Sequence, residues 1–439
     1  MTGGLLVKRA ISPLGPVMTQ AAGQGFALLG QGLLLFKLGD DRYAPIALAL
    51  IAAQIASFIG ELGYGRRLMA EAARTGGASH SLYRTAVGRR LIFLSAIASL
   101  LVIGWIALRG ADDSGLPTLL AALPAILFSA WDPDPILHGL GRHRLAGIAL
   151  AGRWGIFTVI LLIATLMPDE QPDLLVAILA GLALSANFST HLLAAWKTGL
   201  PLRPAFDFSL HIAGAGALWF AAILGTAYWG ILPFLIEARQ PDFAAWAILG
   251  LQILNSLAAL LGRLDRIILP LLANRSWDRV PYAFLSACAA LPCLAALFAV
   301  YVIAPDRFSL LNALILAEWQ FIACTGFLVP WFVSQNREKA LLALHLLILP
   351  AAIVAQFTLA GMSDESLAML LWLRVLATGL LLLGAQLALR VREATLVWPV
   401  LAGLPLAAMT MGSFPAATPV IAAVWGLLAL VSIRRSWPS

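Results

Sequence analysis

The sequence predicts an all-α membrane protein, a polytopic bundle of about 14 membrane-crossing helices. The chain is 61% hydrophobic and 12% charged, with a mean hydropathy of +0.89, which excludes a soluble globular protein. Its apolar segments are long enough to span a bilayer as helices and lack the two-residue alternation of barrel strands. Basic residues fall on alternate connections, as expected of membrane helices. The segments lie at 14–36, 44–62, 91–108, 117–137, 145–167, 174–195, 211–236, 244–262, 282–303, 309–334, 341–359, 366–389, 397–411 and 418–433.

The basic residues are divided unequally between the two sets of connections. One set, together with both termini, holds 22 of the 29 Lys and Arg residues, the other holds five, and Arg153 and Arg374 lie inside segments. Because basic loops stay in the cytoplasm, both termini are expected there. The long Arg-rich connections 63–90 and 263–281 are expected to form helical extensions at the interface. The net charge of +7 suits anionic lipid headgroups and requires no nucleic-acid partner.

Known catalytic motifs are absent from the sequence, so we expect no cofactor and no enzyme activity. There is no Walker, HExxH or HxxxD pattern, and Cys288, Cys293 and Cys324 lie inside apolar segments as expected of packing residues. The outer connections are too short for the large acceptor-binding loop that polysaccharide polymerases need. A polytopic enzyme of glycan assembly, a polymerase or acyltransferase, stays open as the alternative class, and so does a non-transporting scaffold.

The pattern of the first six segments recurs in the next six. Pro16 and His211, at the starts of the first and seventh segments, are 195 residues apart, as are Arg142 and Arg337 after the fourth and tenth. Six helices per half preserve orientation, so the halves are expected to be parallel repeats with a substrate path between them. We therefore predict an N-terminal lobe at 1–205, a C-terminal lobe at 206–392 and an extra helical pair at 393–439. Chance matches among twelve helices are the alternative.

Four short stretches, in order between the predicted helices, carry a family resemblance. They are Leu38-Gly39-Asp40-Asp41-Arg42-Tyr43, Glu61-Leu62-Gly63-Tyr64-Gly65, Leu140-Gly141-Arg142-His143-Arg144 and Pro270-Leu271-Leu272-Ala273. They resemble the "LGPEEYGLYAL", "DLGL…R…A", "LxGLGRxR" and "P-x-L-S/A" motifs of Wzx-type polysaccharide flippases in the multidrug/oligosaccharidyl-lipid/polysaccharide (MOP) exporter superfamily. Ala44-Pro45 replaces the glycine of the first motif.

This resemblance implies a flippase that moves a polyprenyl-pyrophosphate-linked oligosaccharide, of the undecaprenyl type, to the outer leaflet of a bacterial inner membrane. It implies a role in O-antigen, capsule or exopolysaccharide assembly, without a cofactor and beside polymerase or chain-length partner proteins. A drug or metabolite exporter of the same superfamily is the second hypothesis. The resemblance does not identify the saccharide.

Charges inside the helices are the first candidate site residues, because such charges seldom face lipid. Arg374 in the twelfth segment and Glu318 in the tenth are expected at similar depth, about 12–14 Å from the outer end. A guanidinium suits a pyrophosphate, with Glu318 as a gating partner. A static ion pair is the alternative.

Arg153, in the fifth segment, is the second intramembrane cation and a candidate substrate ligand. Asp132 or Asp134 is expected within its reach, and both are candidate ion-coupling groups. Two prolines in Trp131-Asp132-Pro133-Asp134-Pro135 predict a break in the fourth helix. Solvated carboxylates at a helix end are the alternative.

Side-chain amides and helix-end charges complete the candidate set. Gln20, Gln24 and Gln31 fall within about 40° on one face of the first helix, flanked by glycines that permit close helix contact. Such amides suit either sugar hydroxyls or helix–helix hydrogen bonds. Gln252 and Asn255 in the eighth helix have the same two interpretations. Arg263 and Arg266 are expected to attract pyrophosphate or to contact lipid, and Glu61 is expected to gate or to anchor a loop.

Overall fold

The computed structural model is helical throughout the part of the chain that it describes. The described residues fall into two compact units, 1–256 and 257–439. Seven helices among them are long and apolar enough to cross a membrane, which agrees with the predicted fold class. The predicted lobe boundary at residue 205 stays a prediction. The described residues are 14–75, 80–168, 173–207, 215–239, 241, 244–245, 248–252, 266, 269–270, 273, 329–359 and 364–389.

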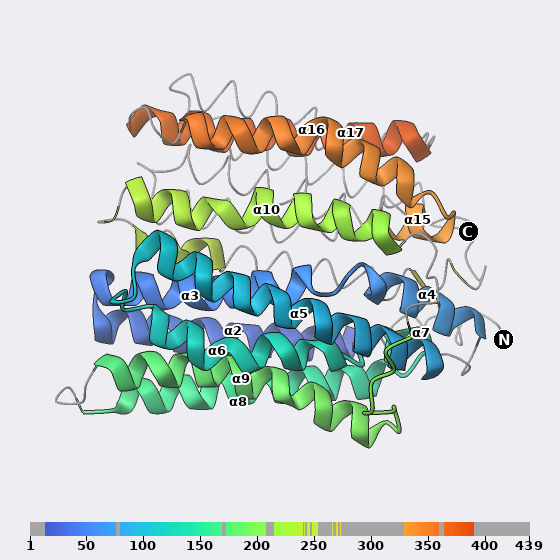
Figure 1. Cartoon of the computed structure of the whole chain (residues 1–439), viewed down its shortest axis with the longest axis horizontal. Helices are drawn as coiled ribbons and strands as arrows, with labels where there is room; N and C mark the ends of the chain where they lie inside the picture. The colour runs from blue at the N-terminus through green and yellow to red at the C-terminus, as the bar shows by residue number, and fades with distance from the viewer. Residues whose placement is uncertain are drawn as a thin grey trace. The chain divides into compact units, whose positions relative to one another are not determined.

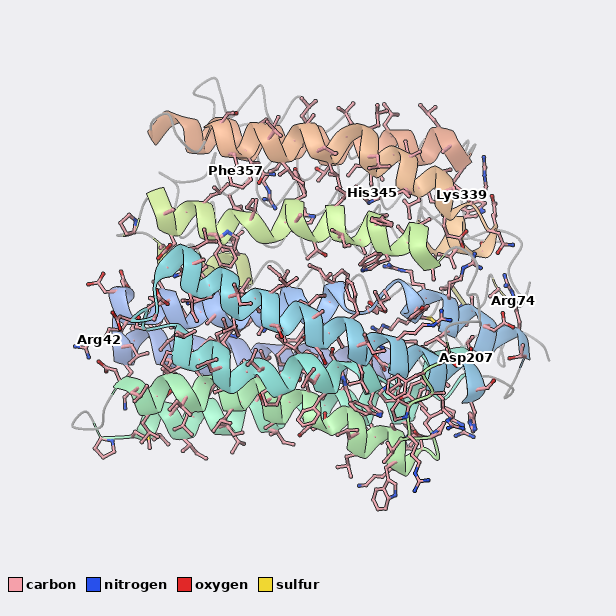
Figure 2. The ribbon with its side chains drawn as sticks, in the orientation of Figure 1. Arg42, Arg74, Asp207, Lys339, His345 and Phe357 are labelled. Atoms are coloured by element: carbon pink, nitrogen blue, oxygen red, sulfur yellow. The ribbon has the colours of Figure 1, made fainter. Side chains whose placement is uncertain are left out.

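The first unit is a bundle of long helices that alternate in direction (Figure 1). Each predicted apolar segment from the first to the seventh corresponds to a helix or, for the fourth, to a broken one. Basic residues of the two sets of connections therefore lie at opposite ends, with Arg42 labelled at one end and Arg74 at the other (Figure 2). The long helices are α2 (Leu14–Leu38), α3 (Asp40–Ile59), α5 (His80–Arg109), α6 (Leu116–Phe128), α8 (His143–Leu166), α9 (Asp173–Lys197) and α10 (Ala215–Arg239).

Glycines set how closely the helices approach one another. A Cβ on Gly23 would come within 2.8 Å of Trp154 and one on Gly30 within 3.4 Å of Leu161, so α2 lies against α8 along its length. A Cβ on Gly181 would meet the Thr118 carbonyl at 2.3 Å, which sets the contact between α9 and α6. Small residues at the interface allow this backbone approach.

The Arg-rich connection after α3 is helical, as the sequence predicts. Amphipathic α4 (Tyr64–Thr75) follows a turn in which Gly63 has φ 68°. The next helix, α5, begins at His80, eleven residues before the expected start of its apolar segment. Hydrogen bonds hold this extension in place, because Arg84 donates to the Arg203 carbonyl and Arg89 to the Asp207 carbonyl.

In the second unit, α16 (Glu338–Leu359) and α17 (Asp364–Leu389) form an antiparallel pair after the short α15 (Val329–Ser334). A Cβ on Gly384 would approach Leu344 to 2.8 Å, and Arg337 donates to the Ala388 carbonyl at 2.8 Å. These helices match the predicted eleventh and twelfth segments. The ninth, thirteenth and fourteenth segments lie outside the described residues.

Candidate functional site

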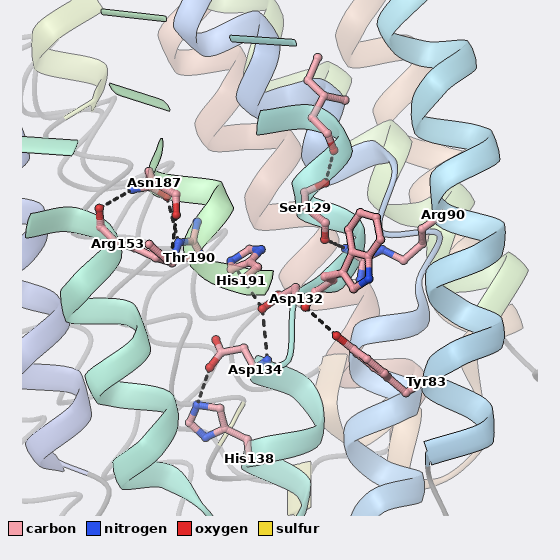
Figure 3. A network of polar contacts seen from close by, with 12 residues as sticks. Tyr83, Arg90, Ser129, Asp132, Asp134, His138, Arg153, Asn187, Thr190 and His191 are labelled. Carbon is pink, nitrogen blue, oxygen red and sulfur yellow. Dashed lines mark hydrogen bonds and ion pairs between the residues drawn. The ribbon is translucent and has the colours of Figure 1, made fainter. Parts of the chain in front are cut away.

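The fourth predicted helix is broken where the two prolines stand. Helix α6 ends at Phe128, a 3₁₀ turn covers Ser129–Trp131, and α7 (Asp134–Gly139) starts after an extended residue, Asp132, with ψ 110°. A break leaves backbone carbonyls without helical partners. Side chains of α5 satisfy two of them: Arg90 donates to the Ser129 carbonyl and Tyr83 to the Trp131 carbonyl, each at 2.7 Å (Figure 3).

Asp132 and Asp134, the predicted coupling groups, each lie beside a buried histidine. His191 Nε2 of α9 is 3.7 Å from Asp132 Oδ1, and His138 Nε2 is 3.5 Å from Asp134 Oδ1. His138 Nδ1 also lies 2.9 Å from His143 Nδ1. Because two imidazole nitrogens at that distance need one proton between them, this pair is a hydrogen bond whose direction depends on tautomer.

Arg153 is bound to α9. Its Nε donates to Asn187 Oδ1 at 2.9 Å, and Asn187 Nδ2 donates back to the Arg153 carbonyl at 3.2 Å. Its guanidinium also stacks over the Phe188 ring, 4.7 Å from the centroid. The same Phe188 ring meets the His191 imidazole edge to face, with the ring centroids 5.3 Å apart. The structure therefore links Arg153 to Asp132 through Phe188 and His191, in one neighbourhood, and gives it Asn187 as a hydrogen-bond partner. Direct contact between Arg153 and either aspartate stays a prediction.

This neighbourhood is a polar network, not a metal site. Among the described residues no group of three or more His, Cys, Asp or Glu is arranged to hold a metal ion. Proton-exchanging groups and a guanidinium lie close together around a helix break (Figure 3), so the arrangement suits anion binding or proton exchange. The network consists of Tyr83, Arg90, Ser129, Asp132, Asp134, His138, His143, Arg153, Asn187 and His191.

Two of the three amides of the α2 stripe, Gln24 and Gln31, are buried. Gln24 and Gln31 are 6% and 7% exposed, and Tyr43 donates to Gln31 Oε1 at 3.4 Å. Gln24 Oε1 is buried and, in the described part of the chain, has no hydrogen-bond partner. The same holds for Nε1 of Trp154, the residue of α8 that packs on Gly23.

The remaining candidates are partly described. Arg374 is fully buried in α17, one turn before Thr378, which donates to its carbonyl at 2.7 Å. Glu61 lies half-buried in the turn between α3 and α4. Gln252 and Arg266 are half-buried helical residues, so their roles stay predictions. Glu318, Asn255, Arg263 and the side chain of Gln20 lie outside the described residues.

Sequence reasoning missed the histidines and Asn187. His138 is buried in α7, and His143 begins α8. The spacing of Asn187 and His191, four residues apart on one face of α9, was a signal for this site. The spacing of Asp134 and His138 was another.

Solved structures of transporters share this fold at low sequence identity. A MOP superfamily transporter from Pyrococcus furiosus has a TM-score of 0.63 and 15% identity, covering 88% of this chain and 96% of that chain. The chain has the same fold as this transporter. A eukaryotic MATE transporter has a TM-score of 0.61 at 15% identity, covering 92% and 99% of the two chains. An outward-facing multidrug resistance MATE transporter has a TM-score of 0.55, again at 15% identity, covering 92% and 97%.

These MOP-superfamily neighbours are transporters and not enzymes. No family model matches the sequence, and no curated protein matches it. The solved structures agree with the fold that the motif resemblance implied, and the flippase function stays a prediction.

Proposed function

We propose that this chain is a flippase for a polyprenyl-pyrophosphate-linked oligosaccharide. It would act by alternating access in a bacterial inner membrane, with both termini cytoplasmic, and serve cell-surface polysaccharide assembly. Its partners would be the lipid-linked cargo, the surrounding lipids and the polymerase or chain-length proteins that use the flipped unit.

The observation that carries this proposal is the presence, among the described residues, of two arginines at mid-membrane depth. Arg153 in α8 and Arg374 in α17 each lie ten residues beyond the start of their helix, about 15 Å along its axis. That depth is near the middle of a hydrocarbon core of about 30 Å. A cationic cargo favours carboxylates at this depth, whereas a pyrophosphate favours guanidinium groups.

The buried amide and indole at the same depth support a sugar headgroup. Gln24 lies ten residues into α2 and Trp154 eleven residues into α8. A buried polar atom without a partner costs about 1–3 kcal/mol, so a native protein keeps one where a ligand or water can satisfy it. A saccharide hydroxyl can donate to the Gln24 oxygen and accept from the Trp154 N–H.

The conformation of the motif glycines supports the resemblance. Gly39, Gly63 and Gly141, one from each of the first three motifs, have φ of 74°, 68° and 70°. Only glycine adopts this left-handed conformation without strain. The three stretches thus form turns at the ends of helices, as the motif order implied.

A drug or metabolite exporter is the second candidate, because a structural neighbour is described as a multidrug resistance transporter. The Pyrococcus furiosus neighbour is described as having a binding pocket of reverse polarity, which suggested a different function for it. Pocket polarity therefore separates functions among proteins of this fold, and the two mid-depth arginines favour an anionic cargo here.

Flipping of a defined cargo in proteoliposomes tests the proposal. Undecaprenyl-pyrophosphate-linked oligosaccharide enters the inner leaflet, and an external glycosidase measures how much reaches the outer leaflet. We expect activity for the wild type and for Arg42→Gln, whose side chain is exposed, and a loss of activity for Arg374→Gln. Absence of flipping by wild-type protein that instead exports small organic cations would refute the flippase and support the exporter.

A further inference from the structure

A cluster of charged and aromatic side chains joins α5 to α10 at the end of the first unit that is predicted to face outward. Arg109 donates from Nη1 and Nη2 to the two carboxylate oxygens of Glu237, at 2.9 and 2.8 Å. Its Nε donates to Asp113 at 2.9 Å, and Asp113 accepts in turn from Trp105 Nε1 at 3.0 Å. The Arg109 and Glu237 side chains are only 19% and 22% exposed. A two-pronged pair between positioned and largely buried groups is among the stronger ionic contacts.

The carboxylate of this pair lies on a short segment of α10 that follows a proline. Pro233, four residues before Glu237, has no N–H to bond the carbonyl of residue 229, so α10 lacks one helical hydrogen bond at this point. The helix is closely packed before the proline, where a Cβ on Gly230 would lie 2.5 Å from Ile55 of α3. The final turn of α10, which carries Glu237, can therefore bend at Pro233 relative to the rest of the helix.

Two other basic residues at this end join helices within the predicted N-terminal lobe. Lys37 donates to the carbonyls of Thr165 and Met167 at the end of α8, and Arg42 pairs with Asp173 of α9 at 2.9 Å. The Arg109–Glu237 pair differs, because α10 is the first helix of the C-terminal lobe that the sequence predicts, although the structure groups α10 with the first unit. Alternating access requires contacts between the lobes to break on one side at a time.

We propose that Arg109 and Glu237 form a latch, which holds the outer end of α10 against α5 in the closed state and opens when α10 bends at Pro233. Asp113 and Trp105 position the guanidinium in both states, since both belong to the same end of α5 and its loop. The latch would act whatever the cargo, so it goes beyond the proposed function.

Distance measurement between spin labels tests the latch. Leu108 is 88% exposed and Ala238 is also exposed, so Leu108→Cys and Ala238→Cys place labels beside the pair without removing it. Cys288, Cys293 and Cys324 are replaced by alanine, and the purified protein is measured in lipid nanodiscs without cargo. We expect mainly a short distance in this background. Glu237→Gln should raise the population of a longer distance by at least about 5-fold, the lower end of typical conformational couplings.

Three further variants distinguish a latch from a general loosening of the bundle. Asp173→Asn removes the other interhelical ion pair at this end and should leave the label distance unchanged. A variant with exchanged charges, Arg109→Glu and Glu237→Arg, should restore the short distance. It also needs Asp113→Asn, because otherwise Glu at position 109 would face the Asp113 carboxylate. Pro233→Ala should reduce the longer population in the Glu237→Gln background.

An unchanged distance distribution in Glu237→Gln would overturn the latch. An equal increase in Asp173→Asn would overturn it too, because the effect would then belong to the whole outer end. Neither result depends on which cargo is carried, so failure of the latch is distinguishable from failure of the flippase assignment.

Discussion

Replacement of Asn187 by leucine should destabilise the first unit by removing the buried partner of Arg153. Asn187 is 1% exposed and makes two hydrogen bonds with Arg153, one to the charged guanidinium and one from its own amide. In soluble proteins a hydrogen bond to a charged group contributes about 1.5–3 kcal/mol. Between transmembrane helices measured couplings average about 0.6 and reach about 1.7 kcal/mol, because the unfolded chain in the membrane also finds partners.

The upper part of the membrane range applies here, because the guanidinium is charged and the site is buried. We expect a loss of about 1.5 kcal/mol, which corresponds to a fall in Tm of roughly 3–6 °C for a unit of this size. Thermal unfolding of the purified protein in detergent measures it. Ser189→Ala is the matched control on the same helix, since its hydroxyl bonds only the nearby Ala186 carbonyl at 2.8 Å.

Asn187→Asp separates the hydrogen bond from simple packing. The carboxylate keeps the acceptor for Arg153 Nε and adds an opposite charge, so its Tm should lie clearly above that of the leucine variant. Equal melting of Asn187→Leu and Ser189→Ala would refute the reasoning, because it would mean that the Arg153–Asn187 contact contributes nothing to stability.

Three other outcomes follow from the same contacts. Arg374→Ala should reach the membrane at normal level yet leave lipid-linked glycan on the inner leaflet, and normal glycan export would remove this residue from the mechanism. Gln24→Leu should abolish flipping without lowering Tm, since it deletes a buried oxygen that has no described hydrogen-bond partner. A clear fall in Tm would contradict the inference that Gln24 Oε1 is unsatisfied. Gly63→Ala should destabilise the protein by more than about 1–2 kcal/mol, the ordinary cost of a left-handed backbone conformation. The added Cβ would also lie 2.4 Å from the Ala215 carbonyl oxygen. An unchanged Tm would contradict this expectation.

Features that depend on local sequence were predictable. Helices α8 and α9 begin and end within two residues of the predicted segments, because segment length and hydropathy decide whether a stretch spans a membrane. The break after Phe128 followed from Pro133 and Pro135, since proline removes helical hydrogen bonds wherever it stands. The glycines flanking the amide stripe predicted close packing, although only Gly23 and Gly30 approach another helix.

Contacts between distant residues were not predictable in the same way. The sequence indicated that Arg153 needs a partner and suggested the two aspartates, but Asn187 on α9 supplies the hydrogen bond. His191 is buried, 3% exposed, beside Asp132. The spacing of Asn187 and His191 places both on one face of α9, but it does not say which carboxylate that face meets.

The sequence by itself determined that this chain lies in a membrane, where its described helices run and which connections carry the basic charge. These properties depend on the transfer of each segment from water to lipid, which is nearly independent of its neighbours. Only the tertiary structure decided which polar groups meet, such as Arg109 and Glu237 across 128 residues of chain. Each residue turns the helix by about 100°, so the packing of glycines and bulky side chains, rather than hydropathy, selects the face that each helix presents to its neighbour.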